Sequence, residues 1–306
     1  MERLNPAIYE YISGIIPREN ILLNEPMSRH ITFRVGGEAK ALVKIQSVEQ
    51  LKKLIHYLKE IQEPYYVKGN GSNILVGDKG YNGVIIEIGS EYSTIRVEDD
   101  KVYAEAGALM STIAKEALDN SLEGFEFASG IPGSIGGGVV MNAGAYGGEL
   151  KDCVEKVTVL SPEGEVLTLS NDELAFGYRT SIFKTRPFIV LDVTIKLTKG
   201  DRALIEEKMK SLNEQRRLKQ PLEFPSAGST FKRPEGYFAG KLIMDAGLRG
   251  FTIGGASVSD KHCGFVINKY NATAEDVYEV IAEVQERVHD KFGVNLEPEI
   301  IFLGTF

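Results

Sequence analysis

Apolar side chains recur with a helical period in several stretches of the chain. Residues 47–62 (SVEQLKKLIHYLKEIQ) open with a serine and a nearby glutamine that can cap a helix, and their apolar positions fall on one face. Residues 273–292 repeat this pattern with valine and isoleucine, whereas 111–120 are shorter and 201–219 are strongly charged. We predict a helix in each range, and expect the one-sided helices to pack on a core.

Short runs typical of β-strands occupy much of the remaining sequence. Two of them, 41–45 and 65–68, flank the first predicted helix. The S-P-E-G-E of 161–165 is typical of a hairpin turn between two alternating strands. The other predicted strands are 83–88, 93–97, 101–107, 155–160, 165–170, 188–197, 263–268 and a final buried strand within 298–304.

These patterns predict an α+β fold of three modules without an internal repeat. Residues 1–68 read as a small α/β module, 69–200 as a β-rich module, and 201–296 as a second α+β module. The last strand follows the third module, and we therefore expect residues 297–306 to rejoin the first.

Composition narrows the class of protein. With 43% hydrophobic and 25% charged residues among 306, the chain can build ordinary hydrophobic cores. A formal net charge of -8 argues against non-specific binding of nucleic acid, and no apolar run is long enough to span a membrane. The N-terminal residues do not resemble a signal peptide, so we expect a cytoplasmic protein.

Cysteine and histidine usage argues against metal or disulfide chemistry. Cys153 and Cys263 stand far apart, which excludes a disulfide framework and a CxxC site. The histidines show no ligand spacing, and we predict that the protein has no metal site. They are His30, His56, His262 and His289.

Two glycine-rich segments carry the strongest functional signal. G-N-G-S-N (69–73) directly follows a predicted strand, and a long segment, SGIPGSIGGGVVMNAGAYGG (129–148), interrupts the β-rich module. Glycine disfavours ordered structure by about 0.5–1 kcal/mol relative to alanine, so the long cluster needs a reason beyond a turn. Backbone N–H groups of such loops can approach a phosphate closely. Neither loop spells G-x-G-x-x-G, which argues against a Rossmann site, and tight β turns are the alternative for 69–73 alone.

With these loops the chain resembles the UDP-N-acetylenolpyruvoylglucosamine reductases, the MurB enzymes of bacterial peptidoglycan synthesis. The resemblance runs from T-F-R-V-G-G at Thr32 to L-E-P-E-I at Leu296. It implies a two-part FAD-binding domain like that of the vanillyl-alcohol-oxidase (PCMH) flavoproteins, followed by a substrate domain. It also implies that both loops bind FAD, through Gly69, Asn70, Gly71, Ser72, Asn73, Ser129, Gly130, Ile131, Pro132, Gly133, Ser134, Gly136, Gly137, Asn142, Gly144 and Ala145.

The resemblance further implies a reaction. NADPH would reduce FAD, and the flavin would pass a hydride to UDP-N-acetylglucosamine enolpyruvate, giving UDP-N-acetylmuramate. Arg179 in G-Y-R-T-S would hold the substrate carboxylate and stabilise the enolate. Ser229 in S-A-G-S-T-F-K-R-P would donate the proton, and Glu299 in L-E-P-E-I would assist it. Lys219 and Arg233 would bind substrate, while Tyr178 would either contact substrate or pack in the core.

Three departures from the family pattern affect these expectations. Arg233 stands where many relatives have asparagine, and Cys263 where a smaller residue is common. The chain also runs directly from G-Y-R-T-S to F-I-V-L-D-V, as in the shorter class that lacks a substrate-covering tyrosine loop. We hypothesise that the third module moves to close the site instead.

Two other functions compete with the reductase. One is a different FAD oxidoreductase of the same fold, such as an oxidase, because a fold does not fix a function. The other is a non-catalytic nucleotide-binding or regulatory protein. We expect the partners to be a UDP-sugar and NADPH, with no nucleic acid or membrane, and we expect a monomer.

Overall fold

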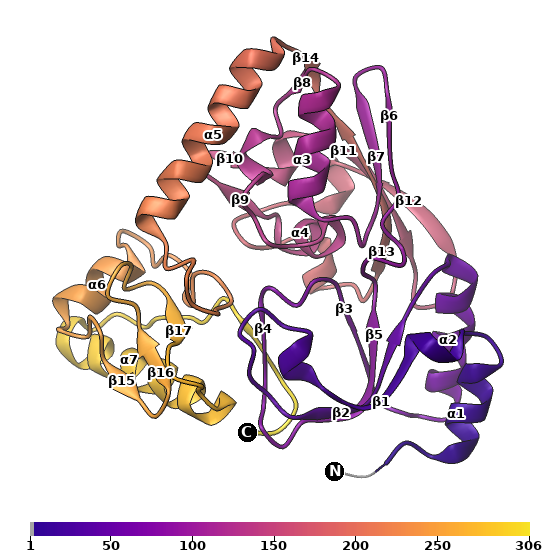
Figure 1. The fold of residues 1–306 in the computed structure, drawn as a ribbon, viewed down its shortest axis with the longest axis horizontal. Coiled ribbons are helices and arrows are strands. Elements are labelled where there is room, and N and C mark those ends of the chain that lie inside the picture. Colours follow the sequence, from indigo (N-terminus) through magenta and orange to yellow (C-terminus); the bar gives the residue numbers. More distant parts are fainter. Residues whose placement is uncertain (1–2) are drawn as a thin grey trace.

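The computed structural model describes residues 3–306 and arranges them in three units (Figure 1). No helix among these residues is long and apolar enough to cross a membrane. Short 3₁₀ helices connect the larger elements at Arg18–Asn20, Met27–Arg29, Glu126–Ala128, Leu150–Asp152, Asp172–Leu174 and Ile182–Lys184.

The first unit is a mixed sheet with two helices. Helix α1 (Pro6–Ser13) precedes it, and α2 (Val48–Glu60) forms where the apolar period predicted a helix, with Ser47 accepting a hydrogen bond from the backbone N–H of Gln50. β2, β5 and β3 run parallel, whereas β1 pairs antiparallel with β2 at the edge. The strand order is β1 (Ile21–Pro26), β2 (Glu38–Lys44), β5 (Tyr81–Glu87), β3 (Tyr65–Lys68).

The expected module boundary at residue 68 is too early. β5 lies beyond that residue and inserts between β2 and β3, so the first unit extends at least to Glu87. The apolar run of β5 looks like any other strand, and sequence alone does not say which sheet it joins.

Both faces of this sheet are buried, because its side chains alternate between two hydrophobic cores. Val43 and Ile86 point into a core shared with α1, α2 and the second unit. Leu42 and Ile85 point into a core shared with the third unit. The first unit therefore lies between the other two.

The second unit is a five-stranded antiparallel sheet covered by two helices. α3 (Met110–Asp119) is the predicted short helix, and the strands β11 and β12 form the predicted hairpin. Two-stranded pairs also occur, β8 (Leu122–Glu123) with β14 (Thr198–Lys199) and β9 (Gly144–Ala145) with β10 (Gly148–Glu149). The sheet order is β12 (Val166–Ser170), β11 (Val154–Leu160), β13 (Ile189–Lys196), β7 (Lys101–Glu105), β6 (Ile95–Glu98).

The long glycine segment contains a helix, which the sequence did not predict. α4 (Ile135–Met141) begins after Ser134 and ends at Asn142, which adopts a left-handed conformation with φ 47°. A side chain at Gly136 would place its Cβ 2.8 Å from Cβ of Ala106. Gly138 is similarly close to Met110 and Leu150, whereas Gly137 has room for a side chain. Two of the three glycines are thus needed for close packing of the helix, and this packing overrides their poor helix propensity.

Helix α5 (Arg202–Lys219) belongs with the second unit rather than the third. It packs against α3 and the 3₁₀ helix Glu126–Ala128, and Figure 1 shows it running along the second unit toward the third. Its range matches the predicted 201–219, but the expected third-module boundary at 201 must move to the end of this helix. The charged sequence of α5 gave no indication of the face on which it packs.

The third unit combines a small sheet with two helices. It contains α6 (Ala239–Asp245), β15 (Thr252–Ile253), β16 (Ala256–Val258), β17 (Val266–Asn268) and α7 (Ala274–Phe292). Thr273 and Asp276 form a capping box at the start of α7, and Gly293 ends it with φ 68°. The Asp78 carboxylate of the first unit also accepts hydrogen bonds from the first backbone N–H groups of α7.

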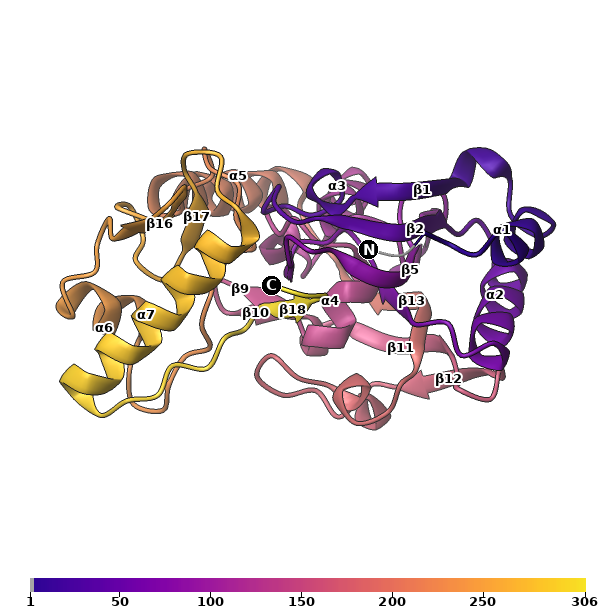
Figure 2. The ribbon, with the colours of Figure 1, turned by 90° about the horizontal axis from the view of Figure 1, so that it is seen from below.

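The last strand returns to the first half of the chain. β18 (Ile301–Leu303) pairs in parallel with β4 (Ile74–Val76), and Figure 2 shows it running from α7 back to the centre of the molecule. β4 and the apolar residues of α7 lie in the same hydrophobic core. The first and third units are therefore joined both by strand pairing and by a common core.

Candidate active site

Three cavities bear on the candidate site among those that lie between the units of residues 3–306. The central cavity, of about 280 Å³, is lined by both glycine loops and by all three candidate catalytic residues, Arg179, Ser229 and Glu299. These three residues also line a C-terminal cavity of about 400 Å³ against the third unit. An outer cavity of about 980 Å³ adjoins the central cavity, and Gly69, Asn70 and Pro132 line both. Arg179, Ser229 and Glu299 thus stand between the central and C-terminal cavities.

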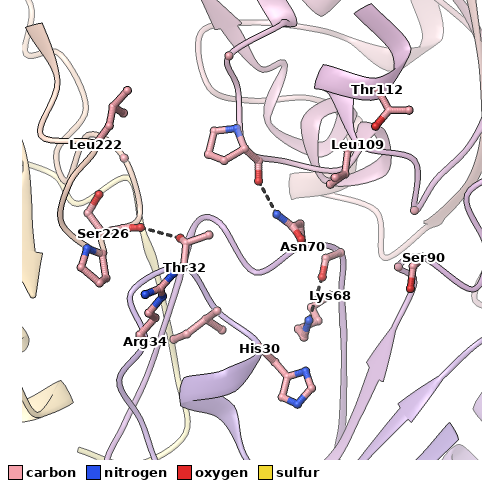
Figure 3. A pocket seen from close by; sticks show the side chains of 18 of the residues that line it. His30, Thr32, Arg34, Lys68, Asn70, Ser90, Leu109, Thr112, Leu222 and Ser226 are labelled. Carbon is pink, nitrogen blue, oxygen red and sulfur yellow. Dashed lines mark hydrogen bonds between the residues drawn. The ribbon is translucent and has the colours of Figure 1, made fainter. Parts of the chain in front are cut away.

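The first glycine loop is tied to its surroundings from both sides. Asn70 donates a 2.6 Å hydrogen bond from Nδ2 to the carbonyl of Pro132 in the second loop, as Figure 3 shows. Asn73 donates one of 3.0 Å to the carbonyl of Glu299. Gly71 has φ +66°, a conformation that favours glycine. The loop therefore links the second glycine loop to a candidate catalytic residue.

The cavity-facing groups of these loops fit FAD. The Ser134 hydroxyl lines the central cavity and is buried without a hydrogen-bond partner among the described residues. A Cβ on Gly69 would lie 2.1 Å from Oγ of Ser134, so only glycine leaves the space beside this hydroxyl free. A buried unpaired hydroxyl in a glycine-lined cradle is what an anionic ligand would satisfy.

Most of the residues expected to bind FAD line the central cavity. They are Gly69, Asn70, Gly71, Ser72, Asn73, Ile131, Pro132, Gly133, Ser134, Gly137, Gly144 and Ala145. Gly130 lines the outer cavity, and Gly136 packs α4 on the sheet. Ser129 and Asn142 are not among the residues that line any of the three cavities.

Asn142 has a structural role that the sequence did not reveal. Its side chain is fully buried, and its Nδ2 donates to Glu149 Oε2 at 2.7 Å and to the carbonyl of Gly177 at 3.0 Å. Its Oδ1 accepts from the backbone N–H of Lys151 at 2.9 Å. Asn142 therefore links the second glycine loop to the turn that carries Arg179, and its expected contact with FAD stays a prediction.

Arg179 points at Glu299 from a constrained backbone. The arginine has φ 52°, and its Nε lies 2.8 Å from Glu299 Oε1. Its Nη2 donates a 3.3 Å hydrogen bond to the carbonyl of Gly144 in the second glycine loop. Strained conformations of this kind concentrate at functional sites. The guanidinium thus bridges the glycine loop and the carboxylate.

Glu299 is held in a mostly buried position. Burial raises the pKa of its carboxyl, although the charge of Arg179 acts in the opposite direction. Glu297, two residues earlier, is instead exposed and pairs with Lys232. The structure therefore distinguishes two glutamates that share one short motif.

Ser229 reaches the site through backbone pairing. Glu299 donates its backbone N–H to the carbonyl of Thr230 at 2.8 Å, and Lys232 donates to the carbonyl of Glu297 at 2.8 Å. Gly228, with φ +77°, turns the chain just before Ser229. This pairing brings the serine to the cavity edge beside Glu299, where it is exposed.

The expected substrate-binding residues separate into two groups. Tyr178 and Arg233 line the C-terminal cavity, and the backbone N–H of Arg233 donates to the Tyr178 hydroxyl at 3.1 Å. The guanidinium of Arg233 also stacks 4.0 Å from the ring centre of Phe238. Lys219, by contrast, is exposed at the end of α5 and is not among the lining residues of the three cavities.

Sequence reasoning missed several charged groups around these cavities. Arg249 and Lys261 line the C-terminal cavity but belong to no glycine-rich or family motif singled out above. His30, Lys68 and Glu87 form a cluster of titratable groups at the outer cavity, and Figure 3 shows His30 and Lys68 there. Burial alone would raise the pKa of Glu87, but nearby His30 and the charge of Lys68 lower it to about 2. Lys68 and Glu87 lie on neighbouring strands and His30 follows a 3₁₀ helix, so only the fold brings the three together.

Comparison with known proteins agrees with this site. Residues 39–170 match the family described as FAD binding domain, and residues 220–303 match that described as UDP-N-acetylenolpyruvoylglucosamine reductase, C-terminal domain. A 4-ethylphenol oxidase from Gulosibacter chungangensis has a TM-score of 0.50 at 15% identity, covering 64% of this chain and 44% of that one, and so shares the fold alone. The expected flavoprotein fold class is confirmed, and the chain is an FAD-dependent oxidoreductase.

Its relatives define the family. UDP-N-acetylenolpyruvoylglucosamine reductases from Caldanaerobacter subterraneus and Clostridioides difficile are 51% and 48% identical to it, covering 97% and 98% of this chain and 98% and 99% of theirs. The crystal structure of the Thermus caldophilus enzyme (MurB) has a TM-score of 0.79 at 35% identity, covering 92% of this chain and 98% of that one. The chain belongs to the UDP-N-acetylenolpyruvoylglucosamine reductase family.

Proposed function

We propose that this protein uses NADPH to reduce UDP-N-acetylglucosamine enolpyruvate to UDP-N-acetylmuramate, with Arg179, Ser229 and Glu299 as its catalytic residues. One observation carries the assignment of roles. These three residues, from distant parts of the chain, meet at the boundary between the glycine-lined central cavity and the C-terminal cavity. A cofactor in one cavity and a substrate in the other would place the reacting atoms beside them.

The two glycine loops would hold the cofactor. Asn70, Ser72 and Ser134 offer side-chain hydrogen bonds, and the loop backbone offers N–H groups, around the central cavity. When bound there, FAD supplies a hydride from N5 of its flavin ring. The hydrogen bond from Asn70 to the carbonyl of Pro132 holds the two loops beside each other.

Arg179 and Glu299 would handle the charge that develops on the substrate. A guanidinium binds a carboxylate through two parallel N–H groups and stays charged as an enolate forms. Nε of Arg179 lies 2.8 Å from Glu299 Oε1, and Nη2 donates to the carbonyl of Gly144. The arginine would exchange these contacts for a substrate carboxylate while Glu299 stays beside it.

Ser229 would deliver the proton that completes the reduction. A serine hydroxyl is a weak acid, so it needs a neighbour that stabilises the alkoxide left behind or returns a proton to it. Glu299 pairs through its backbone N–H with Thr230, the residue after Ser229, and burial raises the pKa of its carboxyl. A carboxyl with a raised pKa can hold a proton nearer to neutral pH than an ordinary one.

The C-terminal cavity would take the UDP-sugar. Its lining includes Arg233, Lys241, Arg249 and Lys261, which suit the negative phosphates of UDP. Lys219 is a weaker candidate than its motif suggested, because it lies outside this lining. The exposed rings of Tyr178 and Phe238 flank the same cavity and offer apolar surface to a sugar or base.

Closure of the site is more local than the movement of the whole third module that we hypothesised. The first and third units share one hydrophobic core and the pairing of β4 with β18, so separating them would expose that core. We propose instead that the Tyr178–Arg233 contact, which links the second and third units, opens and closes over the substrate.

Anaerobic reduction tests the proposal. Adding NADPH should bleach the flavin absorbance, and adding the UDP-linked enolpyruvyl sugar should restore it. The S229A variant should still be bleached by NADPH but should recover at least about a hundredfold more slowly, since general acid catalysis contributes on that order. Bleaching without recovery in the wild type would refute the substrate, and equal recovery of S229A would refute the role of Ser229.

A further inference from the structure

The last turns of α5 form a wall of the cofactor site that no glycine motif indicates. Asn213 and Arg216 lie three residues apart on one side of α5, and Gln220 is the residue at its C-terminal cap. Asn213 lines the outer cavity, Gln220 lines the central cavity, and Arg216 lines both. A cofactor that extended through both cavities would therefore pass along this side of the helix.

Arg216 lies against the point where the two glycine loops are joined. Gly69, Asn70 and Pro132 line both cavities, as Arg216 does, and the Asn70–Pro132 hydrogen bond closes this seam. A Cβ on Gly130 would lie 2.9 Å from Cδ of Arg216 and 3.3 Å from Nη1. The guanidinium is thus pressed against the second loop, which leaves no room for a side chain between them.

The charge of Arg216 is uncompensated. Among residues 3–306, no carboxylate oxygen lies within the 4.0 Å limit of an ion pair with it. Burial lowers the pKa of its guanidinium, and its neighbour Gln220 has a buried Oε1 without a hydrogen-bond partner. Arg217, one residue on, forms two hydrogen bonds to Glu214. A partly buried cation without a counter-ion is unfavourable unless a ligand supplies the negative charge.

We propose that Arg216 is the counter-charge for the pyrophosphate of bound FAD, and that the last turns of α5 are the third wall of the cofactor site. A dinucleotide has two arms joined by a pyrophosphate, which matches two cavities joined at a seam. The glycine loops supply N–H groups on one side of that seam, and Arg216 supplies a full charge on the other.

The proposal rests on FAD binding and not on the substrate proposed above. Arg216 is not among the residues that line the C-terminal cavity, so the phosphates of UDP are not its partner. Arg217 and Lys219 belong to the same short basic segment as Arg216, but their side chains are exposed whereas that of Arg216 is partly buried.

Titration of the flavin-free full chain with FAD tests this role, followed by quenching of flavin fluorescence. We expect R216Q to bind FAD about tenfold to a hundredfold more weakly, the range for a lost charge-assisted contact. We expect R216K to lose less, because it keeps the charge but not the planar fork. R202Q is the matched control, because Arg202 lies on the same helix, is exposed, pairs with Asp119 and is not among the residues lining the three cavities. It should stay within about twofold of the wild type, as is usual for exposed ion pairs.

The charge itself is tested by repeating the titration at several salt concentrations. FAD binding by R216Q should depend less on ionic strength than binding by the wild type or R202Q. The affinity of the holoenzyme for UDP should be unchanged in R216Q. An FAD affinity within about twofold of the wild type in R216Q would overturn the proposal, as would a loss of UDP affinity in place of FAD affinity. If R216Q does not fold, the FAD affinity of R216K is compared with that of R202Q, and equal affinities would overturn the proposal.

Discussion

Replacing Asn142 by alanine distinguishes a cofactor ligand from a residue that holds the site in shape. The sequence placed Asn142 in the FAD loop, but the structure shows it fully buried, capping α4 and bonded to Glu149, Lys151 and Gly177. N142A removes all of these hydrogen bonds at once. It also leaves an alanine in a left-handed conformation with φ 47°.

The structure sets the expected size of the effect. The bond to the Glu149 carboxylate contributes about 1.5–3 kcal/mol, and the two bonds to backbone groups about 1 kcal/mol each. Alanine in the left-handed region adds about 1 kcal/mol of strain. Since Glu149 keeps Lys151 as a partner, we expect N142A to lower the free energy of unfolding by about 3–5 kcal/mol. N142G removes the same bonds without the strain and should lose about 1 kcal/mol less.

Urea unfolding of the flavin-free protein measures these differences. Whatever N142A protein remains folded should still bind FAD, because Asn142 is not among the residues lining the cavities, whereas turnover should fall with the displaced Arg179 turn. A loss of less than about 1 kcal/mol, together with a large loss of FAD affinity, would refute this reasoning and restore Asn142 as a cofactor ligand.

Three further substitutions test other parts of the molecule. Burial raises the pKa of Glu299 above its unfolded value, so at higher pH its charge disfavours the folded state. E299Q should therefore melt at a higher temperature than the wild type at neutral pH and at the same temperature near about pH 4. It should also lose turnover. A lower melting temperature of E299Q at neutral pH would contradict this reasoning. G136A should lower the free energy of unfolding by about 1–3 kcal/mol, because its Cβ would meet Ala106 at 2.8 Å. G137A, whose Cβ would lie 3.6 Å from Ser134 Oγ, is the matched control, and equal stability of the two variants would show that close packing does not explain α4. D78A removes the acceptor of two backbone N–H groups of α7 and should lower the free energy of unfolding in urea by about 1–2 kcal/mol. An unchanged urea midpoint would mean that the capping box alone stabilises the start of α7.

The hydrophobic pattern predicted the longer helices well because their stability depends on an apolar face that is visible in sequence. α2, α3, α5 and α7 lie within a residue or two of their predicted ranges. α4 was missed because its glycines oppose a helix locally, and the contacts that explain Gly136 and Gly138, with Ala106 and with Met110, are tertiary. Module boundaries were misplaced at both ends of the second unit, because the pattern does not show which sheet β5 joins or on which unit α5 packs.

Motifs identified the residue types of the site but not their orientation. The glycine loops and the Arg179, Ser229 and Glu299 motifs pointed to one region, and the fold brings them around neighbouring cavities. Asn142, in the same motif as true cavity-lining residues, turns inward, and Lys219 turns outward three residues after Arg216. Which way a side chain points depends on tertiary packing, which a local sequence pattern does not record.

The pairing of β18 with β4 has a consequence for how the chain is made. β4 and the third-unit side of the first sheet are synthesised early, whereas their partners in α7 and β18 follow only after the whole second unit. One face of the first sheet therefore remains uncovered until the third unit has been synthesised, although its other face can already pack on α1 and α2. Exposed apolar surface of this kind favours association with other nascent chains, so we expect chaperones that bind it to raise the yield of native protein.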